Sequence, residues 1–478
     1  MSLARLQPFR RWARATAAWS AVVLLAGARP AHAQSVWELT PYRVQVVVAA
    51  ARAPELTARL QSDLAEGLVE RVNAVIGAAW DVDVLVAPPP LRRAMLDDLE
   101  SVAVESLPEE SIASEPFDKV FLVTVAPGDP GYDVSVRELD VRTRQWGNVA
   151  RVPAWQAAKL RDAAFQGIHN AFSPLAQIVS VDEDAVVLRL RAGGFPPRDG
   201  SVRTVQPGDL FRPVIRHNER SGKLRGVNAI DWTFLTVDAI APTGVRCRLD
   251  SGFRNPISGR RRGRFEQLAL GVLPSNATTK LTLQARTAPH QPLAGYDVYS
   301  HAPGSKTTEW IGRSDRGGSL EIGPGEPPLR ILLVKHGTEF LARLPMVPGL
   351  RRALTAQIAN DDQRLEAEGF VTGLQEELID LVTRREVLLA QARRSLANRE
   401  LDRAGELIRQ VRSLDTREDF SLYLSQEKAK IFSPDKLVQA KINSMFNKTQ
   451  RLVNQYLDPA PIDQLAGQLH QARTAGTF

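Results

Sequence analysis

Residues 117–125, FDKVFLVTV, followed by residues 132–141, YDVSVRELDV, decide the fold of the N-terminal part of this chain. The first segment is an apolar run rich in β-branched residues, and it predicts a strand. In the second segment apolar and polar side chains alternate, which indicates a strand with one face in water. Asp129-Pro130-Gly131 provides a turn between the two segments. We therefore expect a β-hairpin here.

Strand and helix signals alternate around this hairpin, over residues 40–172. Residues 42–49 (YRVQVVVA) and 82–86 predict two more strands. Between them Pro54 is expected to open a helix, because apolar residues then recur four apart along one stripe. These residues are Leu56, Leu60, Leu64, Leu68, Val72 and Ile76. A short helix near Leu91 and a helix over residues 155–172 complete an order that implies a small layered α/β domain.

Residues 173–272 have a different pattern. Short apolar runs at residues 175–181, 185–190 and 232–240 are separated by turns that contain glycine. Short strands with few helix signals favour a small antiparallel β-barrel of SH3-like size.

Residues 273–349 are expected to form a second β unit, with strands at residues 281–285, 295–299 and 329–334. We expect residues 314–318 (SDRGG) to form a hairpin turn in this unit.

Residues 350–478 are expected to form a helical segment. Apolar residues follow one stripe from Leu374 to Leu396, interrupted where Arg385 takes an apolar position. A second stripe begins at Leu401, and a further helix is expected over residues 434–457. The first two helices form either one tetratricopeptide-type hairpin or two amphipathic helices packed on the rest of the protein.

Three resemblances accompany these patterns. Residues 117–125 with the strand after them resemble the N-terminal α/β domain of TolB. The Pro-Gly-Asp turn at residues 207–209 and its following strands resemble the C-terminal barrel of flagellar assembly protein T, where such a barrel follows a TolB-like domain. Gly295-x-x-Val298 and Gly312-x-x-Asp315-x-x-Gly318 resemble the Ig-like regulatory domain found beside carboxypeptidases. Together they imply an α/β domain, a β-barrel, an Ig-like β-sandwich and a helical segment, and they define no ligand residue.

Residues 1–33 have the pattern of a cleavable secretory signal peptide. Arginines precede an apolar run at residues 15–27, and small residues at Ala31 and Ala33 place the cut before Gln34. An uncut membrane anchor is the alternative, although the run is shorter than the roughly 20 residues that span a bilayer. We expect a periplasmic or secreted protein with no transmembrane span in the mature chain.

Removal of the signal peptide changes the argument from charge. The whole chain has a formal net charge of +7, but residues 1–33 contain five arginines and no acidic residue, so the mature chain is near +2. A nucleic-acid partner is therefore not expected. A single cysteine excludes an intramolecular disulfide. Strand alternation predicts that Cys247 is a buried small apolar residue, with a reactive or intermolecular thiol as the alternative.

Catalytic, metal and nucleotide motifs are missing from the sequence, so we expect no enzyme and no cofactor. Residues 433–436 (SPDK) match the S-x-x-K motif of penicillin-recognising enzymes, but the K-T-G and S-D-N companions are absent. A helix start explains the match, with Ser433 as the N-cap and Pro434 in the first helical position.

Five arginines close together form the remaining local excess of charge, and they are the candidate contacts for an anion or a partner. They are Arg254, Arg260, Arg261, Arg262 and Arg264. A solvated loop is the other interpretation of this cluster.

The sequence as a whole is typical of an exported, non-enzymatic scaffold or adaptor protein of the bacterial cell envelope that binds protein partners. An envelope hydrolase with a non-contiguous active site, or a module that binds anionic glycan, is the alternative.

Overall fold

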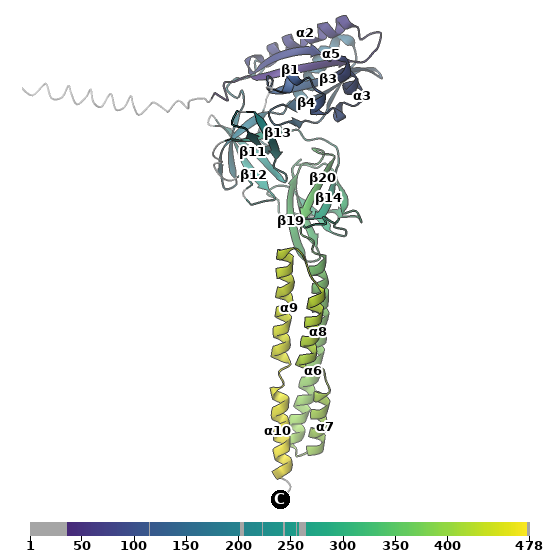
Figure 1. The fold of residues 1–478 in the computed structure, drawn as a ribbon, viewed down its shortest axis with the longest axis vertical. Helices are drawn as coiled ribbons and strands as arrows, with labels where there is room; N and C mark the ends of the chain where they lie inside the picture. The colour runs from purple at the N-terminus through teal and green to yellow at the C-terminus, as the bar shows by residue number, and fades with distance from the viewer. Residues whose placement is uncertain are drawn as a thin grey trace, which may run out of the picture. The chain divides into compact units, whose positions relative to one another are not determined.

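The computed structural model describes residues 36–113, 115–200, 205–221, 223–241, 244–254, 256–257 and 264–475. The predicted signal peptide and its cut between Ala33 and Gln34 lie outside the described residues. The chain divides into two compact units, one up to Ser275 and one from Asn276 (Figure 1).

The first unit begins with a layered α/β domain built on a six-stranded sheet in the order β2-β1-β3-β4-β5, with β6 also paired to β4. The strands are β1 (Tyr42–Ala50), β2 (Trp80–Val86), β3 (Lys119–Gly128), β4 (Gly131–Asp140), β5 (Gln145–Trp146) and β6 (Ala150–Ala154). Strand β1 is parallel to β2 and β3, whereas β3 and β4 form the antiparallel hairpin that the sequence predicts.

Helices cover both faces of this sheet. One face packs on α2 (Ala58–Val75) and α5 (Leu160–Ala171), through a core that contains Leu68, Phe121 and Ile168. The other face packs on α3 (Pro89–Asp97) and on short turns. The short helical segments are α4 (Glu109–Ile112), η1 (Gly77–Ala79), η2 (Leu99–Ser101), η3 (Val104–Ser106) and η4 (Ala157–Lys159).

Two helix starts differ from the sequence prediction. Helix α2 begins at Ala58 instead of Pro54, because the Thr57 side chain accepts a hydrogen bond from the Leu60 backbone N–H at 3.2 Å and caps the helix there. Helix α5 begins at Leu160 instead of Trp155, because the preceding residues first complete strand β6 and the η4 turn.

A closed six-stranded β-barrel follows in the same unit. Its ring is β9-β11-β12-β8-β7-β13, closed by pairing of β13 with β9, and β10 pairs with β9 beside the ring. The strands are β7 (Leu175–Asp182), β8 (Ala185–Leu190), β9 (Leu210–Asn218), β10 (Leu224–Ala229), β11 (Thr233–Ala241), β12 (Gly244–Ser251) and β13 (Phe265–Val272). Cys247 lies fully buried in the barrel core with Phe211 and Leu235, which confirms its predicted apolar role.

The second unit begins with two β-sheets, in the orders β17-β14-β20 and β16-β15-β18-β19. The strands are β14 (Thr279–Ala285), β15 (Asp297–His301), β16 (Glu309–Arg313), β17 (Ser319–Ile322), β18 (Arg330–His336), β19 (Glu339–Met346) and β20 (Ala353–Ile358). The assignment of this two-sheet unit to the Ig-like class stays a prediction.

Two sequence expectations for this unit are wrong in detail. Residues 314–318 do form a tight turn, in which Gly318 N donates to Asp315 O and Asp315 N donates to Ser319 O, each at 2.9 Å. The turn does not join a hairpin, because β16 and β17 on its two sides belong to different sheets. The helical segment does not begin at residue 350, because β20 first pairs in parallel with β14. Sequence patterns near residue 350 could not show that pairing, since β14 lies some 70 residues earlier in the chain.

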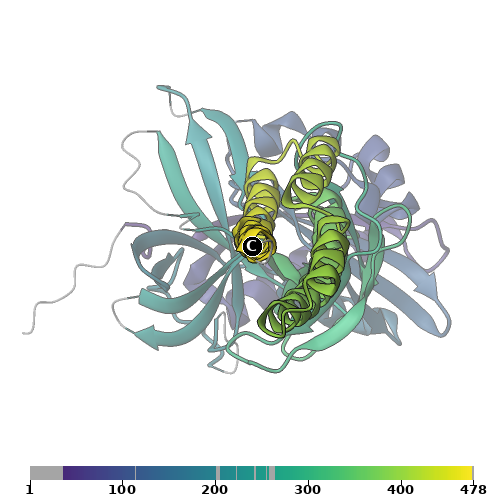
Figure 2. The same cartoon turned by 90° about the horizontal axis from the view of Figure 1, so that it is seen from below.

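Five helices complete the second unit: α6 (Asp362–Ala397), α7 (Leu401–Arg412), α8 (Arg417–Lys430), α9 (Lys436–Tyr456) and α10 (Ala460–Ala475). Helix α6 has 36 residues and is about 54 Å long. Its first half packs with α8 and α9, and its second half packs with α7 and α10 (Figures 1 and 2). The result is a three-helix bundle in which α6 is one continuous helix, while each of the other two positions is occupied by two shorter helices in succession.

This bundle replaces the expected helix pair. Helices α6 and α7 do pack together, with Ala392 and Ala404 buried between them, but α6 is shared with three further helices and forms no separate hairpin. Arg385 interrupts the apolar stripe because it lies level with the break between α9 and α10, where its guanidinium donates to the backbone carbonyl of Asp458. Within the described residues, none of the helices combines the length and apolar character that a bilayer span requires.

Candidate functional site

Two of the five predicted arginines lie within the residues that the structure describes. Arg254 and Arg264 are exposed, whereas Arg260, Arg261 and Arg262 lie outside the described residues. Arg264 immediately precedes β13 and lines a cleft of about 460 Å³. Arg254 does not line this cleft. The residues around it are His217, Asn218, Glu219, Arg220, Arg225, Arg264 and Phe265.

The arginine cleft, as we name this group, is built on the end of the β10-β9-β13 ladder. His217 on β9 is directly opposite Phe265 on β13, so both side chains leave the same face of the sheet. Their rings meet edge to face at 4.6 Å. The next pair, Arg216 and Glu266, leaves the opposite face, where Arg216 Nη1 donates to Glu115 Oε1 at 2.8 Å. Strand alternation therefore separates a face packed on the α/β domain from a face that is open to the cleft.

A β-bulge brings a second arginine to the cleft. In the β10–β9 pairing Leu224 is opposite Asn218 and Gly226 is opposite His217, which leaves Arg225 as the extra residue. Bulges of this kind change the direction of a side chain. Arg220 lies in the turn between the same two strands, which is closed by the hydrogen bond from Glu219 N to Lys223 O at 2.8 Å.

The cleft has an excess of positive charge. Arg220, Arg225 and Arg264 are exposed, and within the described residues none of the three side chains forms an ion pair. Of the described residues that line the cleft, Glu219 alone is acidic. Unpaired guanidinium groups are suited to planar, bidentate recognition of carboxylate, phosphate or sulfate groups. The arrangement can therefore hold an anionic segment against the His217 and Phe265 rings.

Sequence reasoning found Arg264 but missed Arg220 and Arg225. A local signal existed for Arg220, which directly precedes Ser221-Gly222, one of the glycine-containing turns of this region. The proximity of both arginines to Arg264 depends on the pairing of β9 with both β10 and β13, which no sequence pattern shows.

A second charged cluster is closed to solvent. Lys119 is fully buried, and its Nζ lies 2.5 Å from Glu138 Oε1 and 2.8 Å from Asp140 Oδ2. It also donates to the Ser173 carbonyl at 2.5 Å, while Glu138 Oε2 accepts from Ser173 N at 2.6 Å. Burial raises the pKa of Glu138 to about 7, against the opposing effect of Lys119. Because Ser173 joins α5 to β7, the Lys119 cluster stabilises the junction between the α/β domain and the barrel.

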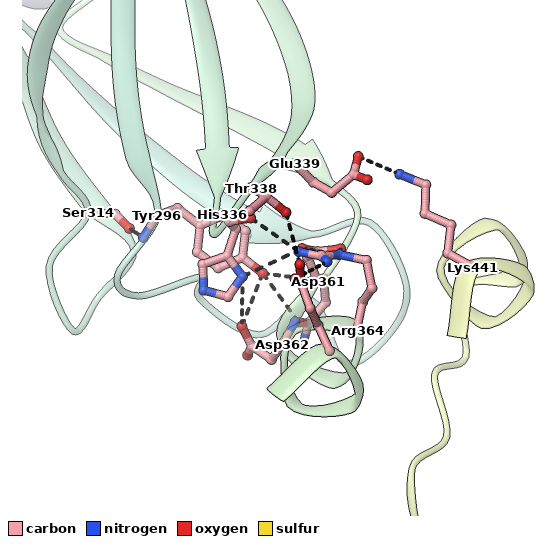
Figure 3. Close-up of polar contacts among 11 residues, drawn as sticks. Tyr296, Ser314, His336, Thr338, Glu339, Asp361, Asp362, Arg364 and Lys441 are labelled. Carbon is pink, nitrogen blue, oxygen red and sulfur yellow. Dashed lines mark hydrogen bonds and ion pairs between the residues drawn. The ribbon is translucent and has the colours of Figure 1, made fainter. Parts of the chain in front are cut away.

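A third cluster joins the two-sheet unit to the helical bundle (Figure 3). The His336 ring stacks flat on Tyr296 at 4.1 Å, and its Nδ1 lies 3.7 Å from Asp361 Oδ2. Asp361 also accepts hydrogen bonds from Arg364 Nε and Nη2, and its backbone N–H donates to the Tyr296 hydroxyl at 2.8 Å. Burial alone would raise the pKa of Asp361, but its contacts with His336 and Arg364 hold it below its usual range. These contacts anchor the first turn of α6.

The possible nucleophiles occupy structural positions. Ser433 is buried, and its hydroxyl accepts a hydrogen bond from Asp435 N at 3.3 Å. Asp435, and not Ser433, caps α9, because its Oδ1 accepts from Leu437 N at 3.0 Å, and helix α9 begins at Lys436 instead of Pro434. The Asp435 carboxylate also accepts two hydrogen bonds from Arg286, from Nε at 2.6 Å and from Nη2 at 2.9 Å. Burial raises the pKa of the Cys247 thiol to about 12.

Comparisons with known proteins add little to this geometry. No protein-family model matches the chain, and no curated protein matches it. A solved structure, TolB from Acinetobacter baumannii, matches at 10% identity over 66% of this chain and 96% of that chain, with a TM-score of 0.17. A TM-score this low carries no argument about fold or function, so the TolB-like interpretation stays a prediction.

Proposed function

We propose that this protein is an exported scaffold or adaptor of the bacterial cell envelope, which binds an acidic segment of a partner protein in the arginine cleft. The observation that carries the proposal is the convergence of Arg220, Arg225 and Arg264, none of which has an ion-pair partner among the described residues. The signal peptide that the sequence predicts in residues 1–33 supports the envelope location. The strand orders of the α/β domain and of the two-sheet unit support the TolB-like and Ig-like interpretations as part of the proposal.

The physical character of the cleft favours a segment with several carboxylates. Each exposed ion pair contributes only about 0.2–1 kcal/mol, so one carboxylate cannot bind tightly by charge alone. Three guanidinium groups around one cleft act together, and their field also accelerates encounter with an acidic partner. Binding of this kind weakens as salt is added, because the groups are exposed.

Charge reversal in the cleft tests the proposal. The mature chain from Gln34 is compared with Arg220→Glu/Arg225→Glu/Arg264→Glu and with a control, Arg52→Glu/Arg59→Glu/Arg93→Glu. The control arginines are exposed, and the structure shows no ion pair for them within its described residues. The probes are a ten-residue glutamate-rich peptide and crosslinking capture of partners in isolated envelopes.

We expect the cleft variant to lose peptide binding and its crosslinked partner, while the control keeps both. Equal loss in the two variants would attribute the effect to net charge and overturn the proposal. Binding of polygalacturonate in place of the acidic peptide, lost in the cleft variant alone, would assign the cleft to an anionic glycan. Peptide binding that persists in the cleft variant would remove the cleft from the function.

A further inference from the structure

The outer face of the four-stranded sheet in the second unit carries an unusual row of side chains. In the register of that sheet, Trp310 on β16 is opposite Tyr299 on β15, and Tyr299 is opposite Leu333 on β18. Residues opposite each other on neighbouring strands leave the same face. The row therefore extends across three strands, a span of roughly 10 Å at the usual strand spacing.

A second row lies beside the first, two residues along β15 and β18 and, because each edge pairing contains a β-bulge, three residues along β16 and β19. Arg313 is opposite Asp297, Asp297 is opposite Lys335, and Lys335 is opposite Phe340 on β19. Arg343, which is opposite Leu333, completes the first row at the same edge. We name these two rows the aromatic face. It combines three rings with three cations and one carboxylate.

The aromatic face is not part of the core. The alternating residues Val298 and Val334 are fully buried on the inner side of the same strands. On the two edge strands Trp310 is 57% exposed and Phe340 is 60% exposed, and Tyr299 and Leu333 on the strands between them are half-buried. Single exposed apolar side chains are common on protein surfaces, but a contiguous row across one sheet indicates a binding surface.

The Trp310 ring is held in place by its neighbours. Arg313 donates two hydrogen bonds to the Asp297 carboxylate, from Nε at 2.8 Å and from Nη2 at 3.0 Å. The Trp310 Nε1–H donates to the same carboxylate at 3.4 Å. Lys335 Nζ lies 5.6 Å from the centre of the Phe340 ring. Since these groups are already ordered, a ligand loses less free energy in fixing them.

We propose that the aromatic face binds an anionic polysaccharide. The flat C–H faces of sugar rings fit on the exposed indole of Trp310 and on the half-buried phenol ring of Tyr299 beside it, which present an apolar surface with a polar tip. Sugar hydroxyls match the donors and acceptors of Arg313 and Asp297, and the excess of cations over carboxylates favours acidic sugars. This site lies in the second unit and is independent of the arginine cleft in the first. A protein with both sites would connect a protein partner to an envelope glycan.

Polysaccharide binding by the full mature chain tests this inference. The variants are Trp310→Ala and Tyr299→Ala, with Trp310→Phe as the conservative change and Trp155→Ala as the control, because Trp155 is an exposed tryptophan of the first unit. Affinity for polygalacturonate, and for dextran as a neutral polymer, is measured by calorimetry and affinity electrophoresis. Circular dichroism checks that each variant folds.

We expect Trp310→Ala to weaken polygalacturonate binding about tenfold or more, with Trp310→Phe close to the parent and Trp155→Ala unchanged. Unchanged binding in both alanine variants, or no binding by the parent, would overturn the inference, as would equal affinity for dextran. Loss of glutamate-peptide binding in Trp310→Ala would assign the face to a protein ligand instead. The triple arginine-cleft variant should still bind polygalacturonate, which separates failure of this inference from failure of the proposed function.

Discussion

Replacement of Lys119 by methionine should destabilise the junction between the α/β domain and the barrel. Methionine fills the space of the aliphatic stem but leaves the carboxylates of Glu138 and Asp140 buried without their cation. Removing one partner of a buried ion pair costs about 3–5 kcal/mol. The Ser173 carbonyl also loses its donor. A large part of the first unit's stability margin would be lost, because domains are stable by only about 5–15 kcal/mol.

The loss should depend on pH. Without Lys119 the buried Glu138 carboxyl is harder to ionise in the folded chain, so its folded pKa, which burial already raises, rises further above the unfolded value. Stability is then retained at acidic pH and falls as pH increases. Hydrogen exchange of the β3 and β4 amides, measured at pH 5 and pH 8 on the mature chain, reports this locally.

Lys159→Met is the matched control, since Lys159 is mostly exposed and its ion pair with Asp162 at 4.0 Å contributes at most about 1 kcal/mol. The reasoning would be refuted if Lys119→Met lost less than about 1 kcal/mol, or if its loss were the same at pH 5 and pH 8.

Four further outcomes are expected. In the parent chain burial raises the pKa of Glu138 to about 7. The stability that this group contributes is therefore fully present below about pH 4.5 and is lost as pH rises through 7. Glu138→Gln should flatten this pH dependence of the unfolding free energy, measured in urea. Cys247 should react with a disulfide reagent only as fast as the barrel unfolds, because burial raises its thiol pKa to about 12, and rapid reaction of the native protein would contradict this. Arg385→Met should cost the bundle about 1 kcal/mol in thermal unfolding followed by circular dichroism, since the Asp458 carbonyl loses its donor; no change would mean that water replaces the bond. Amino-terminal sequencing of exported protein should begin at Gln34, and an intact arginine-rich start would contradict cleavage.

Local periodicity explains which elements could be predicted. The β3–β4 hairpin, the stripe of α2 and the alternation around Cys247 are properties of neighbouring residues, and the structure has all three. Helix α8 was missed because only Phe420 and Leu424 of it are buried, which leaves too weak a stripe to recognise. Strand β20 was missed for a different reason, since its partner β14 is distant in the chain.

The arginine cleft shows the same limit at the level of a site. Arg264 was found because it stands in a local cluster of arginines, whereas Arg220 and Arg225 reach it only through the β10-β9-β13 pairing. Arg385 was visible as an interruption of a helical stripe, but its explanation required the break between α9 and α10.

By itself the sequence determined the order of the α/β domain, the barrel, the β unit and the helical segment, because hydrophobic periodicity and turn residues act over a few positions. It also determined the distribution of charge along the chain. Only the tertiary structure decided the closure of the barrel, the shared helix α6 and the two groups of surface side chains proposed here as binding sites. Strand pairing and helix packing join residues far apart in the chain, and no local pattern encodes which distant segment becomes the neighbour.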